Sequence, residues 1–86
     1  MAIVRLRGQL EKLAGSGSEH EIAGDTVSEL LTTLETTFDA LEGWILDERG
    51  MLRRHINVFV NGELATPESP VSEGDKIEIL PAISGG

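Results

Sequence analysis

The sequence predicts an α+β fold in which a mixed sheet of four to five strands packs on one main α-helix. Three segments alternate apolar and polar side chains, as half-buried strands do. One further segment, residues 27–41, places apolar side chains at three- and four-residue spacing, which indicates an amphipathic helix. A chain of 86 residues holds one modest core, so we expect one domain over residues 1–80 and a flexible C-terminal tail over residues 81–86.

The first expected strand lies near the N-terminus, where apolar Val4, Leu6 and Leu10 alternate with polar Arg5, Arg7 and Gln9. Residues 15–18 read Gly-Ser-Gly-Ser and predict a turn. We expect residues 19–23 to return antiparallel to the first strand as a loose hairpin.

The helix is expected to begin at Thr26, because Thr26 followed three residues later by Glu29 forms a capping box that satisfies amide donors of the first turn. Its apolar stripe consists of Val27, Leu30, Leu31, Leu34, Phe38 and Leu41. A stripe of this kind could be a docking face, but in so small a domain it is nearly always core. We therefore expect the helix to cover the sheet.

Residues 40–54 show no clean period and predict an irregular connection. Trp44 is expected to pack at the edge of the core, with an aromatic interaction site as the alternative. Arg53 and Arg54 could contact a ligand phosphate, but no Gly-rich loop stands beside them. We interpret this pair as surface charge.

Residues 56–60 form the clearest strand of the chain, and Asn61-Gly62 is the signal of a type I′ turn that returns the chain towards Leu64. A polar turn then precedes a last strand over residues 76–80. A right-handed crossover places this last strand parallel to the first, in the middle of the sheet. Three apolar side chains could serve either the core or an exposed docking patch for a partner: Phe59, Leu64 and Ile79.

Composition narrows the classes of function. Fifteen acidic against seven basic side chains give a formal charge of −8, which disfavours nucleic acid and is compatible with a basic protein partner or an ordinary acidic surface. No apolar run approaches the roughly 20 residues of a membrane span. Arg5 and Arg7 interrupt what would be the apolar part of a signal peptide, so we expect a cytoplasmic protein without membrane contact.

Catalytic equipment is sparse in the sequence. There is no cysteine, and His20 and His55 are not in a ligand-like spacing, so no metal site is expected. Neither a Gly-rich phosphate loop nor a Gly-x-Ser-x-Gly nucleophile motif is present. These observations favour a substrate or carrier protein over an enzyme.

The candidate site is the end of the chain. Gly85-Gly86 would present an unhindered carboxylate that another enzyme could activate, although many chains end in glycines of no significance. Pro81 stiffens the base of the tail, and Ile83, Ser84 and Gly85 supply small or flexible residues for an enzyme to enclose. Fully extended, the tail would reach about 20 Å.

Three motifs carry a resemblance to a known family: Ile-Asn-Val-Phe-Val-Asn-Gly at residues 56–62, Val-Ser-Glu-Gly-Asp-Lys-Ile-Glu-Ile-Leu-Pro at residues 71–81, and the terminal Gly85-Gly86. In this order they resemble the ubiquitin-like sulfur carriers of the β-grasp fold, the ThiS/MoaD family. The resemblance covers essentially the whole chain. The single Pro81, and the stretch before the strand at Ile56, are most similar to thiocarboxylate carriers that feed cysteine synthesis; molybdopterin-type members more often show two prolines before the tail.

The resemblance implies that an E1-like enzyme uses ATP to adenylate the Gly86 carboxylate, and that a sulfur donor then converts it to a thiocarboxylate. The carrier itself would bind no cofactor. It would be a co-substrate or a subunit of a synthase complex rather than an enzyme, and would pass its sulfur to a biosynthetic enzyme. Two alternatives stay open: a protein modifier joined to lysine through Gly86, and a plain interaction domain.

Overall fold

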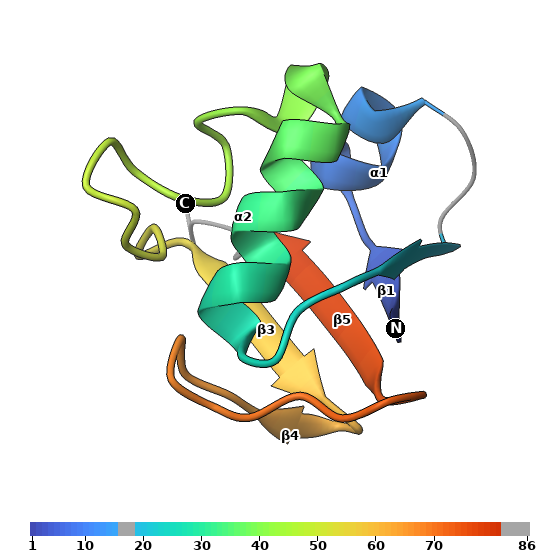
Figure 1. Ribbon diagram of the computed structural model, residues 1–86. Coiled ribbons are helices and arrows are strands. Elements are labelled where there is room, and N and C mark those ends of the chain that lie inside the picture. Colours follow the sequence, from blue (N-terminus) through green and yellow to red (C-terminus); the bar gives the residue numbers. More distant parts are fainter. Residues whose placement is uncertain (16–18, 82–86) are drawn as a thin grey trace.

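A computed structural model describes residues 1–15 and 19–81 of the chain, as a five-stranded sheet with its longest helix lying across one face (Figure 1). The strands are β1 (Ala2–Leu6), β2 (Glu19–Ile22), β3 (Ile56–Val60), β4 (Glu63–Leu64) and β5 (Lys76–Pro81). Their order in the sheet is β2-β1-β5-β3-β4, with β1 and β5 parallel and the other neighbours antiparallel. The predicted α+β class, and the last strand in the middle beside the first, are confirmed.

The N-terminal strand ends earlier than the alternation predicts. β1 stops at Leu6, and residues that we expected to extend it form the short helix α1 (Gln9–Ala14). Gly8 turns the chain out of the sheet with a positive φ of 59°, and Leu10 is buried from the helix instead. The assignment of Leu10 to the first strand was therefore wrong. It arose because a step of four residues, from Leu6 to Leu10, fits the period of a helix as well as that of a strand.

Strand β2 pairs antiparallel with β1, as expected. The turn predicted at residues 15–18 falls mostly outside the described residues, because only Gly15 is described. Gly15 ends α1 in the left-handed region with φ 76°, and its N–H donates to the Glu11 carbonyl. A glycine is the residue that adopts this conformation at least cost.

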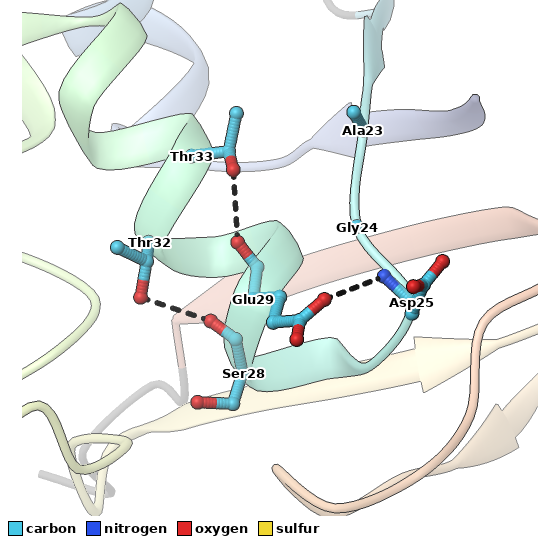
Figure 2. Close-up of a pocket in the computed structure, with 7 residues that line it drawn as sticks. All are labelled: Ala23, Gly24, Asp25, Ser28, Glu29, Thr32 and Thr33. Carbon is cyan, nitrogen blue, oxygen red and sulfur yellow. Dashed lines mark hydrogen bonds between the residues drawn. The ribbon is translucent and has the colours of Figure 1, made fainter.

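The main helix, α2 (Val27–Thr37), begins with the predicted cap. The Glu29 N–H donates to Thr26 Oγ1 at 3.2 Å, and the Asp25 N–H donates to the Glu29 carboxylate at 3.0 Å, a bond drawn in Figure 2. The Glu29 carboxylate thus accepts a hydrogen bond from Asp25 rather than from Thr26. The backbone N–H groups of Asp25 and Glu29 at the start of the helix are both hydrogen-bonded. Gly24 permits the approach, since a Cβ there would lie 2.6 Å from the Leu30 nitrogen.

The buried stripe of α2 consists of Val27, Leu30, Leu31 and Leu34. The helix ends at Thr37, before the last two residues of the predicted stripe. Phe38 is half-buried beyond its end, and Leu41 is buried from a single 3₁₀ turn, η1 (Asp39–Leu41). Both therefore pack on the core, but from outside the helix.

The connection from η1 to β3 is irregular, as predicted, apart from a bridge between Leu46 and Leu52. The Glu35 carboxylate on α2 accepts hydrogen bonds from the N–H groups of Ile45 at 3.0 Å and Leu46 at 2.8 Å. Ile45 and Leu46 fill the edge of the core, whereas Trp44 is 41% exposed. The prediction that Trp44 packs there was wrong, because its two apolar neighbours take that position.

The β3–β4 hairpin has the predicted turn. Asn61 and Gly62 both have positive φ, at 51° and 88°, as a type I′ turn requires. The Asn61 side chain donates to Asp75 at 3.0 Å and accepts from the Lys76 N–H at 3.0 Å. The turn of the hairpin is thereby tied to the start of β5.

Candidate functional site

The site begins where β5 ends. Pro81, the last residue of β5, pairs with Ile56 at the start of β3. On its other side it lies close to Gly8, where an added Cβ would come within 3.1 Å of the Pro81 ring. The sheet thus extends one residue beyond the predicted last strand. The chain leaves it from a central strand, at a position fixed from both sides.

Pro81 is the only predicted tail residue that the structure places. Ile83, Ser84, Gly85 and Gly86 lie outside the described residues. Their roles in tail recognition, and the role of Gly86 as the reacting group, stay predictions.

The face of the sheet opposite α2 carries a row of paired residues. Following the register across the strands, the row reads Glu19, Arg5, Glu78, Phe59 and Leu64. Arg5 forms an ion pair with Glu19, and Arg7 forms one with Glu78 at 3.0 Å. These four charged side chains are between 37% and 51% exposed, so this face, which we call the open face, is in contact with water.

The open face ends in an apolar edge. Phe59 is half-buried, and its neighbour Leu64 on β4 is 68% exposed, the largest exposed fraction of any large apolar side chain in the described residues. Both are accessible on the open face, and their role in docking stays a prediction. Ile79 is not accessible, because it is fully buried on the face covered by α2. Its place in a docking patch was therefore wrong: adjacent positions of a strand point to opposite faces, and Glu78, not Ile79, shares the open face with Phe59.

Two acidic side chains, Glu19 and Asp75, have a pKa below the ordinary value because of specific contacts. The pKa of Glu19 is lowered by the hydrogen bond from Arg5 and by its positive charge. The same contact raises the pKa of Arg5. At the far end of the sheet, the Ser72 N–H and the Asn61 amide lower the pKa of Asp75. The open face thus presents fixed charges of alternating sign beside an apolar edge.

A shallow hollow of about 590 Å³ lies on the other side of the molecule, beside the first turns of α2 (Figure 2). The hydroxyls of Thr32 and Thr33 there donate to the carbonyls of Ser28 and Glu29. These two hydroxyls and the Glu29 carboxylate are thus engaged within the chain. In the described parts of the chain, no three acidic or histidine side chains cluster as metal ligands would. No described helix has the length and apolar character of a membrane span.

The fold, with its central strand β5 leading towards Gly86, defines the structural class of the protein. Solved structures that share this arrangement are ubiquitin-like β-grasp proteins. The sequence matches the ThiS family over residues 4–86, and the chain belongs to that family. The resemblance drawn from the three sequence motifs is thereby confirmed.

Two curated relatives carry different names. Small archaeal modifier protein 1 of Haloferax volcanii is 36% identical over 84 residues, which cover 95% of this chain and 97% of that protein. Sulfur carrier protein CysO of Mycobacterium tuberculosis is 33% identical over 73 residues, which cover 74% of this chain and 75% of that protein. One family therefore includes a modifier and a sulfur carrier at similar distance from this chain.

Solved structures of proteins with these two names also have a fold similar to that of this chain. The CysO chain in the Amycolatopsis orientalis BexX/CysO complex superposes with a TM-score of 0.86 at 31% identity, covering 100% of each chain. Crystalline SAMP1 of Haloferax volcanii gives a TM-score of 0.84 at 34% identity, covering 99% of this chain and 98% of that one. The chain is thus similar along its full length to a member seen in complex with another protein.

Proposed function

We propose that this protein is a sulfur carrier whose Gly86 carboxylate is adenylated by an E1-like enzyme and then converted to a thiocarboxylate. One observation carries the proposal: the family match extends to Gly86, the residue to which β5 leads from the middle of the sheet. The relative named as a sulfur carrier supports it.

The chemistry explains why such a carrier needs no catalytic residues of its own. A carboxylate is a poor electrophile, so ATP in the activating enzyme supplies an adenylate leaving group and pyrophosphate departs. A sulfide-level nucleophile then attacks the acyl carbon, AMP leaves, and a thiocarboxylate forms. The carrier contributes a terminus without side chains at Gly85 and Gly86, which a narrow channel can enclose. Its domain supplies recognition.

Two kinds of partner follow from this cycle. An activating enzyme forms the acyl-adenylate, and a biosynthetic enzyme takes up the sulfur, in cysteine, molybdopterin, thiamine or specialised-metabolite synthesis. The relative solved with BexX supports assembly with such a second protein. Leu64 and Phe59 at the apolar edge of the open face are the residues we propose for docking the activating enzyme.

A second function is favoured by a specific finding, since the relative that is 36% identical over 95% of this chain is named a modifier. In that case the same activated Gly86 would react with a lysine amine and form an isopeptide bond. Both functions share the activation step and differ in the nucleophile that follows. They therefore make different predictions for the fate of Gly86.

The test is the mass of the C-terminal peptide of the protein isolated from its native cells without reducing agents or amines. A sulfur carrier shows replacement of one oxygen by one sulfur at Gly86. A modifier shows Gly86 linked to lysines of other proteins. An unmodified terminus without adducts, in cells that express the pathway, contradicts both and leaves an interaction domain.

A variant lacking Gly86 is the matched control. It retains all the residues that form the described sheet and helices, so its thermal unfolding should match that of the full chain. It should acquire neither sulfur nor lysine adducts. Sulfur on this variant would show that Gly86 itself is not required, and the mass of the C-terminal peptide would tell whether Gly85 or another residue carries it.

A further inference from the structure

A second hollow lies at the end of the sheet from which β5 leaves. It measures about 340 Å³ and is lined by Gly43, Trp44, Arg53 and His55. His55 directly precedes Ile56, the residue that pairs with Pro81. In Figure 1 this connection leads into the start of β3. The hollow, which we call the Trp44 hollow, therefore adjoins the point where the chain continues towards Gly86.

The walls of the Trp44 hollow are held in place. The Arg53 N–H donates to the Ile45 carbonyl at 3.0 Å, and Arg53 Nε donates to the Gly43 carbonyl. The Trp44 N–H donates to the Leu41 carbonyl at 2.9 Å. Ile45, next in sequence, is fully buried. The backbone of Trp44 is thus held in place while its side chain is partly exposed, although the chain has only one Trp and two Phe.

The charge of the Trp44 hollow is opposite to that of the molecule as a whole. The chain carries a formal charge of −8, yet the charged side chain that lines the hollow is Arg53, and Arg54 follows it directly in sequence. In the described parts of the chain, the four ion pairs use the N-terminus, Arg5, Arg7 and Arg49, so neither Arg53 nor Arg54 is among their cations. Exposed aromatic and arginine side chains together are the composition of binding hot spots.

The short distance between Pro81 and Gly86 would bring an enzyme bound to Gly86 close to the Trp44 hollow. Gly86 is five residues beyond Pro81, and five extended residues span at most about 17 Å. An enzyme that encloses Gly86 in a closed channel must bring the mouth of that channel against the end of the sheet where Pro81 and the hollow lie. A channel mouth with a carboxylate side chain beside an apolar one would complement Arg53 and Trp44.

We propose that the Trp44 hollow is a docking surface for the enzyme that activates Gly86, and that an acidic segment at the mouth of its channel contacts Trp44 and Arg53. This inference rests on the proposed function. It assigns that enzyme a second contact, separate from the apolar edge at Phe59 and Leu64. The charge contact speeds encounter, and the Trp44 contact slows dissociation.

The experiment follows thiocarboxylate formation over time in native cells, by mass spectrometry of the C-terminal peptide after induced expression. Three variants are compared with the wild type: Trp44→Ala, Arg53→Glu and Arg54→Glu. Lys12→Glu is the matched control, because it makes the same charge change on the exposed surface of α1. Thermal unfolding of each purified variant checks the fold, and Arg54→Glu leaves the hydrogen bonds of Arg53 in place.

We expect Trp44→Ala and Arg53→Glu to slow thiocarboxylate formation about tenfold, the effect of losing one hot-spot contact. Arg54→Glu should slow it less, and Lys12→Glu should leave it unchanged. If the wild type acquires sulfur and folded Trp44→Ala and Arg54→Glu acquire it at the same rate, the docking surface is refuted and the proposed function stands. If the wild type acquires no sulfur, the proposed function fails and this inference fails with it.

Discussion

The two faces of the sheet are built from the same strands and differ in nearly every property. On the face covered by α2, Val4, Val58, Ile77 and Ile79 have no exposed surface. On the open face, the alternate residues Arg5 and Glu78 are charged, partly exposed and paired with neighbours across the strands. The comparison teaches that the positions that form the core and the positions that meet water are separated by one residue of register.

The clearest contrast lies within β5 itself. Ile77 and Ile79 point into the core, and Glu78 between them points to water. Substitutions on the open face should therefore leave the packing of the strand undisturbed. The predictions below test this separation, from the largest expected effect to the smallest.

Ile79→Ala should destabilise the protein by about 3 kcal/mol, because it removes a fully buried side chain and leaves a cavity. Its open-face neighbour Glu78→Ala should cost no more than about 1 kcal/mol, the range of an exposed ion pair. Urea unfolding of both variants measures the difference. Equal effects would contradict the separation of the two faces.

Gly24→Ala should cost about 2 kcal/mol, because the new methyl group forces the backbone of Leu30 at the start of α2 to move. Gly15→Ala is the control, since Gly15 has a positive φ but open space around it, and its cost of about 1 kcal/mol reports backbone conformation alone. Thermal unfolding compares the two. A smaller effect at Gly24 than at Gly15 would show that the helix can shift away without loss of packing.

His20→Leu should stabilise the protein by about 1 kcal/mol, because His20 is a polar exception on the covered face. It pairs with Val4, its ring lies 4.6 Å from that of Phe38, and its Nε2 is buried without a hydrogen-bond partner. Leucine keeps the apolar contact and removes the unsatisfied nitrogen. A lower melting temperature would show that the imidazole is satisfied in solution.

Acid should act on the polar contacts and leave the apolar core untouched. The pKa of Asp75 lies below its ordinary 3.8 when folded, so its contribution to stability is present above that value and is lost as pH falls through the folded pKa. Melting temperatures between neutral and strongly acidic pH should therefore fall more steeply in the wild type than in Asp75→Asn. Parallel curves would mean that the contacts from Ser72 and Asn61 contribute nothing.

Much of the fold follows from local signals in the sequence. Asn61-Gly62 specifies its turn because both residues tolerate positive φ, and Thr26 with Glu29 specifies the start of α2. The parallel pairing of β5 with β1 follows from the handedness of crossovers. These features are predicted because few alternatives compete with them.

The errors have separate physical causes, each of which depends on contacts between residues distant in sequence or on a local turn. Leu10 fits both a strand and a helical period, and the turn at Gly8 decides between them. Trp44 stands beside Ile45 and Leu46, and tertiary packing buries the two smaller side chains. The proposed reacting end, Gly86, is predicted from Gly85-Gly86 and the family motifs. The Trp44 hollow required three-dimensional structure, because it joins Gly43 and Trp44 to residues nine to twelve positions further along the chain.

The central position of β5 also has a mechanical consequence. A force that pulls on the chain beyond Pro81 acts along the axis of β5, which lies between β1 on one side and β3 on the other. The hydrogen bonds of both ladders lie across this direction, so they must be sheared together instead of peeled apart singly. A force applied through the C-terminal end of β5 therefore has to overcome two ladders of hydrogen bonds at once.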